Sequence, residues 1–307
     1  MQNVTPRVDV DGRPIDCHDG CLRYFHGRFY WYGTAYGATD GFTPANLYTC
    51  YSSPDLTNWQ PHDVLIPQRP EGVYYRPYVV FNPTTQKFVL WFNWYPRLWE
   101  GQLGAAVADR PEGPFEIVAP RVELTRQTPG DHNVFVDDDG CAYLVYTDIK
   151  GDGIDRHAIA VERLDPTFTA SAGEASTTLD RRVEAPAMFK RGGLYYVVFG
   201  QTCCFGPEGA DARVLAAERP LGPYRKIGDI NRDATGKIII PGQQTDICVL
   251  PTPSGDALLW MADLWGSRPD GIKGHDLQYW SEPLSFYSDG SIATLRRVES
   301  FSIVLAP

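Results

Sequence analysis

Hydrophobic residues gather along this chain in short aromatic runs, each preceded by a turn-forming segment. The clearest case is residues 183–200, where an apolar run ends at a KRGG turn over 190–193 and an aromatic, β-branched run follows over 194–199. Two apolar runs joined by a glycine-containing turn are typical of a β-hairpin. Runs of the same character lie at 29–32, 87–92, 141–146 and 256–261.

A second signature follows these runs at broadly even intervals. It lies at 52–61, 109–118 and 218–227, with a variant at 164–171, and it indicates a turn leading into an outer strand. Five such repeats, each with about four short strands, predict a five-bladed β-propeller. A β-sandwich is the alternative fold, but it gives no reason for five repeats. We therefore expect an all-β fold, a single five-bladed β-propeller domain over residues 1–307.

Composition agrees with many strands joined by turns. The chain has 43% hydrophobic and 13% aromatic residues, with 29 Gly and 25 Pro. Its net charge of −10 argues against nucleic acid and anionic membranes as partners. We expect no membrane span, because no run of 18 apolar residues occurs. The first residues lack a basic region followed by an apolar one. A cytoplasmic protein is expected, or a secreted one whose signal peptide has been removed.

The cysteines and acidic runs of this sequence do not have the spacing of a metal-binding motif. The seven cysteines are odd in number and include no paired CxxC units, so we expect mostly reduced, buried thiols. Cys203 and Cys204 are adjacent and too strained for an ordinary disulfide. The run Asp137-Asp138-Asp139-Gly140 lacks the remaining spacing of a calcium loop, and we interpret it as a hairpin turn.

Polar residues precede the aromatic strand in every repeat. The first strand of each propeller blade lines the central channel, so a residue entering it points toward the axis. Asp19, Asp131 and Glu184 each stand ten residues ahead of such an aromatic run, and the other two repeats carry Tyr75-Arg76 and Gln243-Gln244. These residues are expected to converge on one pocket that holds three carboxylates and one arginine.

Three carboxylates around a small cavity suit glycoside hydrolysis. That reaction needs one protonated acid and one ionised carboxylate, roughly 6.5–9.5 Å apart in an inverting enzyme. A third carboxylate raises the pKa of the acid, because like charges disfavour ionisation.

Two segments of the chain resemble glycoside hydrolase family 43, whose members are five-bladed propellers. They are VEAPAMFKRGGLYYVV, beginning at Val183, and DHNVFVDDDGCAYLVY, beginning at Asp131. The segments CHDGC, RPYVVFN and Gln244–Ile247, followed by Asp263-Leu264-Trp265, resemble most the exo-β-1,3-galactanase-like branch. The resemblance implies an inverting, exo-acting glycosidase that releases terminal galactosyl residues from a polysaccharide or oligosaccharide.

Carried onto this sequence, the resemblance gives each catalytic position a role. Glu184 would be the general acid, and Asp131 would tune its pKa and orient it. Asp19 matches the family's usual general base, whereas the galactanase branch tends to have glycine there and is thought to use the glutamine matching Gln244. The base is therefore Asp19 or Gln244, and a carboxylate is the better base on pKa grounds. Tyr75 replaces a glutamate common in that branch, which keeps arabinofuranosidase, galactofuranosidase and xylosidase activities open.

Sugar-binding positions are expected near strand ends and in loops, where aromatic and polar side chains can face a ring. No metal site and no redox or organic cofactor are expected, although the family leaves room for a structural calcium ion in the channel. Two rivals stay open: a carbohydrate-binding propeller without catalysis, and a phosphorylase or transferase, which would need more channel cations than Arg76. The candidate substrate-binding residues are His18, Tyr36, Tyr75, Arg76, Trp94, Gln201, Asp263 and Trp265.

Overall fold

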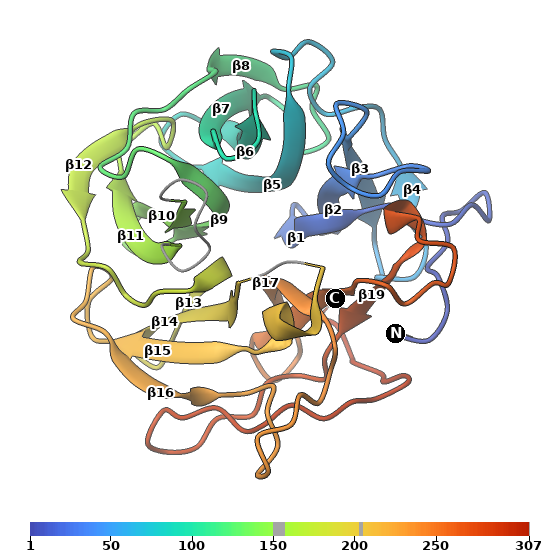
Figure 1. The fold of residues 1–307 in the computed structure, drawn as a ribbon, viewed down its shortest axis with the longest axis vertical. Helices are drawn as coiled ribbons and strands as arrows, with labels where there is room; N and C mark the ends of the chain where they lie inside the picture. The colour runs from blue at the N-terminus through green and yellow to red at the C-terminus, as the bar shows by residue number, and fades with distance from the viewer. Residues whose placement is uncertain (150–156, 203–204, 307) are drawn as a thin grey trace.

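The computed structural model describes residues 1–149, 157–202 and 205–306. Its strands form five antiparallel sheets that surround a central channel as the blades of a propeller (Figure 1). The elements in chain order are β1 His18–Phe25, β2 Arg28–Ala35, β3 Leu47–Ser53, β4 Gln60–Pro61, β5 Val73–Asn82, β6 Lys87–Tyr95, β7 Gln102–Ala108, β8 Glu116–Ala119, β9 Pro129–Val136, β10 Ala142–Asp148, β11 Ala158–Leu164, β12 Ser171–Ala175, β13 Val183–Arg191, β14 Leu194–Gln201, η2 Pro207–Ala210, β15 Arg213–Ala217, β16 Arg225–Asp229, β17 Gln243–Leu250, β18 Ala257–Leu264, η3 Lys273–His275 and β19 Leu277–Trp280.

The all-β, five-bladed propeller expected from the repeats is confirmed. Each aromatic run forms the second strand of a blade, in β2, β6, β10, β14 and β18. The innermost strands are β1, β5, β9, β13 and β17, which border the channel (Figure 1). Four blades have four strands, whereas the described residues of the last blade form three.

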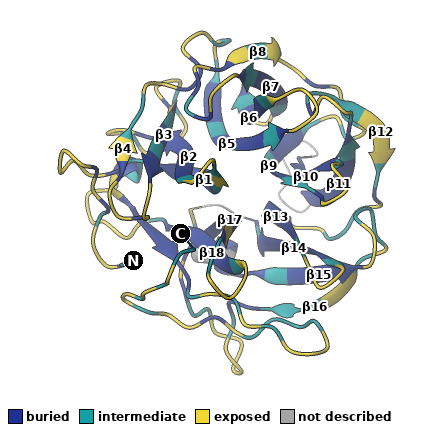
Figure 2. Ribbon diagram, turned by 180° about the vertical axis from the view of Figure 1, so that it is seen from behind, coloured by how far each residue is buried: buried dark blue, intermediate teal, exposed yellow. Residues whose placement is uncertain are grey.

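Burial explains why the second strands are so apolar. They are covered on both faces by neighbouring blades, and all seven residues of β10 are buried. The outer strands β4, β8 and β12 carry exposed residues at the rim (Figure 2). Since both faces of a second strand are buried, its sequence is a largely continuous hydrophobic run and does not alternate between polar and apolar residues.

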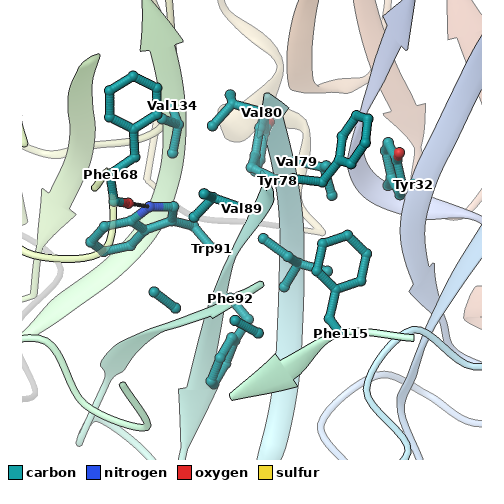
Figure 3. Close-up of a cluster of buried hydrophobic side chains, with 14 of the residues drawn as sticks. Tyr32, Tyr78, Val79, Val80, Val89, Trp91, Phe92, Phe115, Val134 and Phe168 are labelled. Atoms are coloured by element: carbon teal, nitrogen blue, oxygen red, sulfur yellow. Dashed lines mark hydrogen bonds between the residues drawn. The ribbon is translucent and has the colours of Figure 1, made fainter. Parts of the chain in front are cut away.

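Large aromatic side chains fill the space between blades. Figure 3 shows one such cluster, in which Trp91 of β6 lies among Val89, Val134 and Phe168. The indole Nε1 of Trp91 donates a hydrogen bond to the Phe168 carbonyl at 2.7 Å, so its polar atom is satisfied inside the core. Contacts of this kind hold adjacent blades at a fixed angle and fix the inner strands around the channel.

The first residues of the chain complete the last blade. The Asn3 side chain donates to the Trp280 carbonyl and accepts from the Trp280 backbone N–H, both at 3.0 Å. The Arg7 guanidinium lies over the Trp280 ring at 4.2 Å and donates to the Gln278 carbonyl at 2.7 Å. These contacts cover the edge of β19 and close the ring of blades.

The cysteines of the described ranges are free thiols, four of them buried, as expected; Cys203 and Cys204 lie outside those ranges. The Asp137–Gly140 segment is a hairpin turn, in which the Gly140 N–H donates to the Asp137 carbonyl at 3.0 Å. Among the described residues, no helix has the length and apolar character needed to cross a membrane.

Candidate active site

A cavity of about 170 Å³ lies at the end of the channel where the inner strands begin. Every inner strand contributes one charged or amide side chain to its lining, and these are Asp19, Arg76, Asp131, Glu184 and Gln243. The predicted convergence of the three carboxylates and the arginine on one pocket is therefore what the structure shows.

Irregular backbone turns two of these side chains toward the axis. Strand pairing is shifted by a bulge between His18 and Cys21 in β1 and between Tyr75 and Tyr78 in β5. Within these bulges Asp19 has φ 60° and Arg76 has φ 50°, a left-handed conformation uncommon for residues with a Cβ. Bulges next to active sites commonly re-aim a side chain in this way.

The bulge in β1 requires a glycine at residue 20. A Cβ atom at residue 20 would stand 1.8 Å from the Tyr32 carbonyl oxygen, so only glycine fits. The sequence Asp19-Gly20 is thus part of the machinery that orients the carboxylate.

Arg76 ties two of the carboxylates together. Its Nε lies 2.9 Å from Asp131 Oδ1, and its Nη2 lies 3.8 Å from Asp19 Oδ1. The guanidinium is buried, so its charge acts on both carboxylates with little solvent screening. Asp131 also accepts a hydrogen bond from the Ala185 backbone N–H at 3.1 Å, which fixes the strand that carries Glu184.

Asp19 is a buried carboxyl with a perturbed pKa. Burial raises its pKa to about 6; Arg76 opposes this shift, and the charge of Asp263 adds to it. The Tyr36 hydroxyl donates a hydrogen bond to Asp19 Oδ2. The Asp19 backbone N–H donates to Asp263 Oδ2 at 2.7 Å, so both the main chain and the side chain are held in place.

Glu184 is held from the neighbouring blade. Gln243 Nε2 donates to Glu184 Oε1 at 2.9 Å, and Gln243 Oε1 in turn accepts from Trp265 Nε1 at 2.9 Å. This chain of hydrogen bonds sets the orientation of the Gln243 amide, because only its nitrogen can donate to the carboxyl group. Glu184 is 6% exposed and opens onto the cavity.

Gln244, the alternative base, lies away from the cavity. Its Nε2 donates to the carbonyls of Ala185 and Val198, at 2.9 and 2.7 Å, and its Oε1 accepts from Trp260 Nε1 at 2.9 Å. It is 0% exposed. All its side-chain polar atoms thus serve to join β17 to β13, β14 and β18, and the glutamine that faces the cavity is Gln243.

Three of the candidate substrate-binding residues line the cavity, namely Tyr36, Tyr75 and Arg76. His18 and Asp263 lie behind it, where His18 Nδ1 is 3.1 Å from Asp263 Oδ1. Burial lowers the pKa of His18, but the charge and hydrogen bond of Asp263, together with the charges of Asp16 and Asp19, raise it to about 9. The two residues form a buried ion pair that supports Asp19.

The remaining candidates are also outside the lining. Trp265 packs behind Gln243 and against Tyr36, with ring centroids 5.5 Å apart. Trp94 donates to the Pro120 carbonyl at 2.9 Å, and Gln201 accepts from Arg213 Nη2 at 2.8 Å. These contacts explain Trp94 and Gln201 as structural residues of their blades.

Several lining residues were missed by the sequence patterns. Thr147 is the last but one residue of the second strand of the third blade and His157 precedes its third strand, so neither stands at the head of an inner strand. Aromatic and aliphatic side chains form the rest of the cavity lining. These are Phe42, Tyr95, Leu98, Trp99, Ile149 and Phe205.

A larger cavity of about 640 Å³ lies at the opposite end of the channel. Its charged lining residues include Arg23 and Asp246, which form an ion pair at 2.5 Å. In the described part of the chain, no three His, Cys, Asp or Glu side chains are grouped as metal ligands. A structural calcium ion in the channel stays a prediction.

The family model for glycosyl hydrolases family 43 matches residues 14–245, which is more than half of the chain. The chain belongs to this family. The family 43 enzymes are glycoside hydrolases, so the predicted enzyme class is confirmed.

Two curated relatives of this family 43 chain act on furanosides by name. A β-D-galactofuranosidase of Aspergillus niger is 26% identical over 217 residues, covering 66% of this chain and 61% of its own length. An arabinoxylan arabinofuranohydrolase of Bacillus subtilis is 26% identical over 226 residues, covering 60% of this chain and 42% of its own. The chain therefore spans about half the length of these relatives.

Solved structures share the fold over nearly the whole chain. A family 43 β-1,3-galactosidase with galactodeoxynojirimycin superposes with a TM-score of 0.83 at 22% identity, covering 99% of this chain and 100% of that one. An exo-β-1,3-galactanase from Clostridium thermocellum gives 0.81 at 23% identity, covering 96% of this chain and 64% of its own. At these identities the likeness establishes the five-bladed architecture.

Proposed function

We propose that this family 43 enzyme is an inverting, exo-acting glycosidase that removes one terminal galactosyl residue at a time. The observation that carries the proposal is the set of three buried or half-buried carboxylates around one small cavity, each on a different blade. The cavity volume of about 170 Å³ is below the roughly 300–1,000 Å³ usual for small-molecule pockets. It suits a single sugar ring better than a stretch of polymer.

Each carboxylate has a distinct part in the proposed reaction. Glu184 delivers its proton to the glycosidic oxygen, held in place by Gln243. Asp19 takes a proton from the attacking water, and a pKa near 6 suits a base that works close to neutral pH. Asp131 orients the Glu184 strand through the Ala185 N–H and keeps negative charge near the acid. No step requires a redox or organic cofactor.

Hydrolysis of a panel of aryl glycosides tests this function. The panel contains β-D-galactopyranoside, β-D-galactofuranoside, α-L-arabinofuranoside and β-D-xylopyranoside, with β-1,3-galactan oligomers beside them. We expect turnover of the galactoside with inversion at the anomeric carbon, seen by NMR of the first product formed. Glu184→Gln should retain the fold and lower kcat on an oligomer about 10²–10⁴-fold, since it removes the proton donor.

Other results would point to other functions. Preference for a furanoside would move the substrate toward the galactofuranosidase or arabinofuranohydrolase relatives. Sugar binding without turnover of any glycoside would favour a carbohydrate-binding propeller. More than a tenth of wild-type kcat in Glu184→Gln, on a substrate with a poor leaving group, would remove Glu184 from the acid role.

A further inference from the structure

The part of the cavity wall that the third blade supplies beyond β9 holds polar atoms that have no use in the catalytic scheme. Thr147 Oγ1 and both ring nitrogens of His157 lack a hydrogen-bond partner among the described residues, and so does Arg76 Nη1. Thr147 is 1% exposed and His157 is 3% exposed, yet both line the cavity. Buried polar atoms are nearly always hydrogen-bonded, so this group indicates a place for a polar ligand.

The backbone of this wall is firmly held. Thr147 pairs with Ile159 across the β10–β11 ladder. The His157 carbonyl accepts a hydrogen bond from the Arg182 backbone N–H at 2.8 Å, two residues before Glu184. The main chains of His157 and of the general acid are therefore fixed to each other, and a ligand bound by one side chain is placed relative to the other.

The chemistry of these groups matches a diol better than an anion. Burial lowers the pKa of His157, against the charges of Asp131 and Asp148, and this favours the neutral ring. A neutral imidazole offers one donor and one acceptor, and a threonine hydroxyl offers both. Sugar hydroxyl groups can donate to each acceptor and accept from each donor, whereas a phosphate or carboxylate would be repelled by the three carboxylates of the cavity.

We propose that Thr147 and His157 bind two hydroxyl groups of the sugar whose glycosidic bond is cleaved, and that this wall of the third blade determines which sugar the enzyme accepts. The inference rests on the proposed function, because it takes the cavity to be the site of that sugar. Trp99 packs edge-on against His157, with ring centroids 6.0 Å apart, and limits how far the imidazole can turn.

Paired substitutions and deoxy sugars test the assignment. Wild type, Thr147→Val, His157→Ala and His157→Gln are compared by kcat and KM on the best aryl glycoside, and by inhibition with D-galactose and its monodeoxy analogues. We expect kcat/KM to fall about 10–100-fold in the Val and Ala variants, because a hydrogen bond to a substrate hydroxyl is lost. His157→Gln, which keeps a donor and an acceptor, should recover part of this loss.

The deoxy series separates direct contact from a structural effect. One monodeoxy sugar should inhibit wild type more weakly than galactose does, and this difference should vanish in the variant that lost the matching partner. An equal penalty in wild type and both variants would overturn the inference, as would unchanged kcat/KM in both variants. Thr147→Val is nearly isosteric, so it gives an answer even if His157→Ala fails to fold.

Failure of the inference can be told apart from failure of the proposed function. If wild type turns over a glycoside and the variants match it, only the role of Thr147 and His157 is wrong. If wild type turns over no glycoside of the panel, the proposed function and this inference fall together. Asp256→Asn, an exposed change at the opposite cavity, serves as the matched control for handling and expression.

Discussion

The two ends of the central channel are built from the same five inner strands but differ in how their charges are balanced. At the larger end, the charge of Asp246 is neutralised by Arg23 at 2.5 Å, and Asn133 Nδ2 donates a hydrogen bond to its other carboxylate oxygen at 3.0 Å. At the smaller end, three carboxylates share the single cation Arg76 among the lining residues that the structure describes. Excess negative charge in a confined cavity, rather than cavity size, marks the end suited to acid–base chemistry.

The strands are irregular at the smaller end of the channel and regular at the larger end. The bulges of β1, β5, β13 and β17 all lie toward the smaller cavity, next to residues such as Asp19 and Arg76. At the larger end the β1–β2, β5–β6, β13–β14 and β17–β18 strand pairs continue in unbroken register to their hairpin turns. Irregular pairing is thus confined to the end where side chains must be aimed at a substrate.

The largest expected effect separates the two candidate bases at the smaller end. Asp19→Ala should lower kcat about 10²–10⁴-fold, and azide should partly restore turnover by giving a glycosyl azide of inverted configuration. Gln244→Ala should mainly lower Tm, because it leaves two buried carbonyls and the Trp260 indole without their partner. Rates of both variants, with and without azide, are measured on one substrate. A lower kcat in Gln244→Ala than in Asp19→Ala, with an unchanged Tm, would overturn the choice of Asp19 as the base.

A substitution at the larger end should lower the stability of the protein and leave its catalytic rate unchanged. Asp246→Asn leaves Arg23 without its counter-charge. Because the Arg23 side chain is 18% exposed, the cost should stay below the value of about 3–5 kcal/mol for a fully buried pair. The free energy of unfolding, measured in urea, should fall accordingly, while kcat per folded molecule stays close to wild type. A large loss of kcat in folded Asp246→Asn would show that the two ends are coupled.

The pH dependence of the free energy of unfolding should reveal the raised pKa of Asp19 at the smaller end. Since the pKa of Asp19 is raised to about 6, above about 3.9 in the unfolded chain, the folded protein binds this proton more tightly. Stability should therefore fall as pH rises between these two values, by up to about 3 kcal/mol. Asp19→Asn should lack this loss. The difference between the two unfolding curves is plotted from pH 3 to pH 8, and a flat difference would contradict the raised pKa.

The smallest effect is expected from an exposed carboxylate of the larger end. Asp256→Asn should change the free energy of unfolding by less than about 0.5 kcal/mol and leave kcat/KM unaltered. The side chain borders the large cavity but is exposed to solvent. A clear loss of activity in this variant would assign a role in turnover to the larger cavity.

Local pattern was enough to predict the fold and the three carboxylates. The aromatic runs predicted the buried second strands because those strands must be apolar on both faces. Asp131 and Glu184 were found because inner strands begin near the channel axis. Asp19 was found by the same count although its register differs: the residue paired like Glu184, immediately before the bulge, is His18, and Asp19 reaches the cavity from within the bulge.

Other parts of the site depend on register and on strands far apart in sequence. An extra residue in β17 decides whether Gln243 or Gln244 faces the cavity, and a bulge leaves no periodic signal. Thr147 lies on the second strand of one blade and His157 immediately precedes its third strand, where the pattern indicates only burial. Trp94 and Gln201 were expected at the site because they stand at strand ends, but their side chains turn toward their own blades.

Closure of the ring has a consequence for the order of folding. The Met1 amino group donates to the Phe301 carbonyl at 2.7 Å, and Gln2 bridges to Ser300, so the last blade is completed by residues almost a full chain length apart. Contacts of such sequence separation form slowly, because a very long loop must close first. The same blade supplies Gln243 to Glu184. During synthesis the earlier blades would assemble first, and the acid would gain its partner only when the final blade docks.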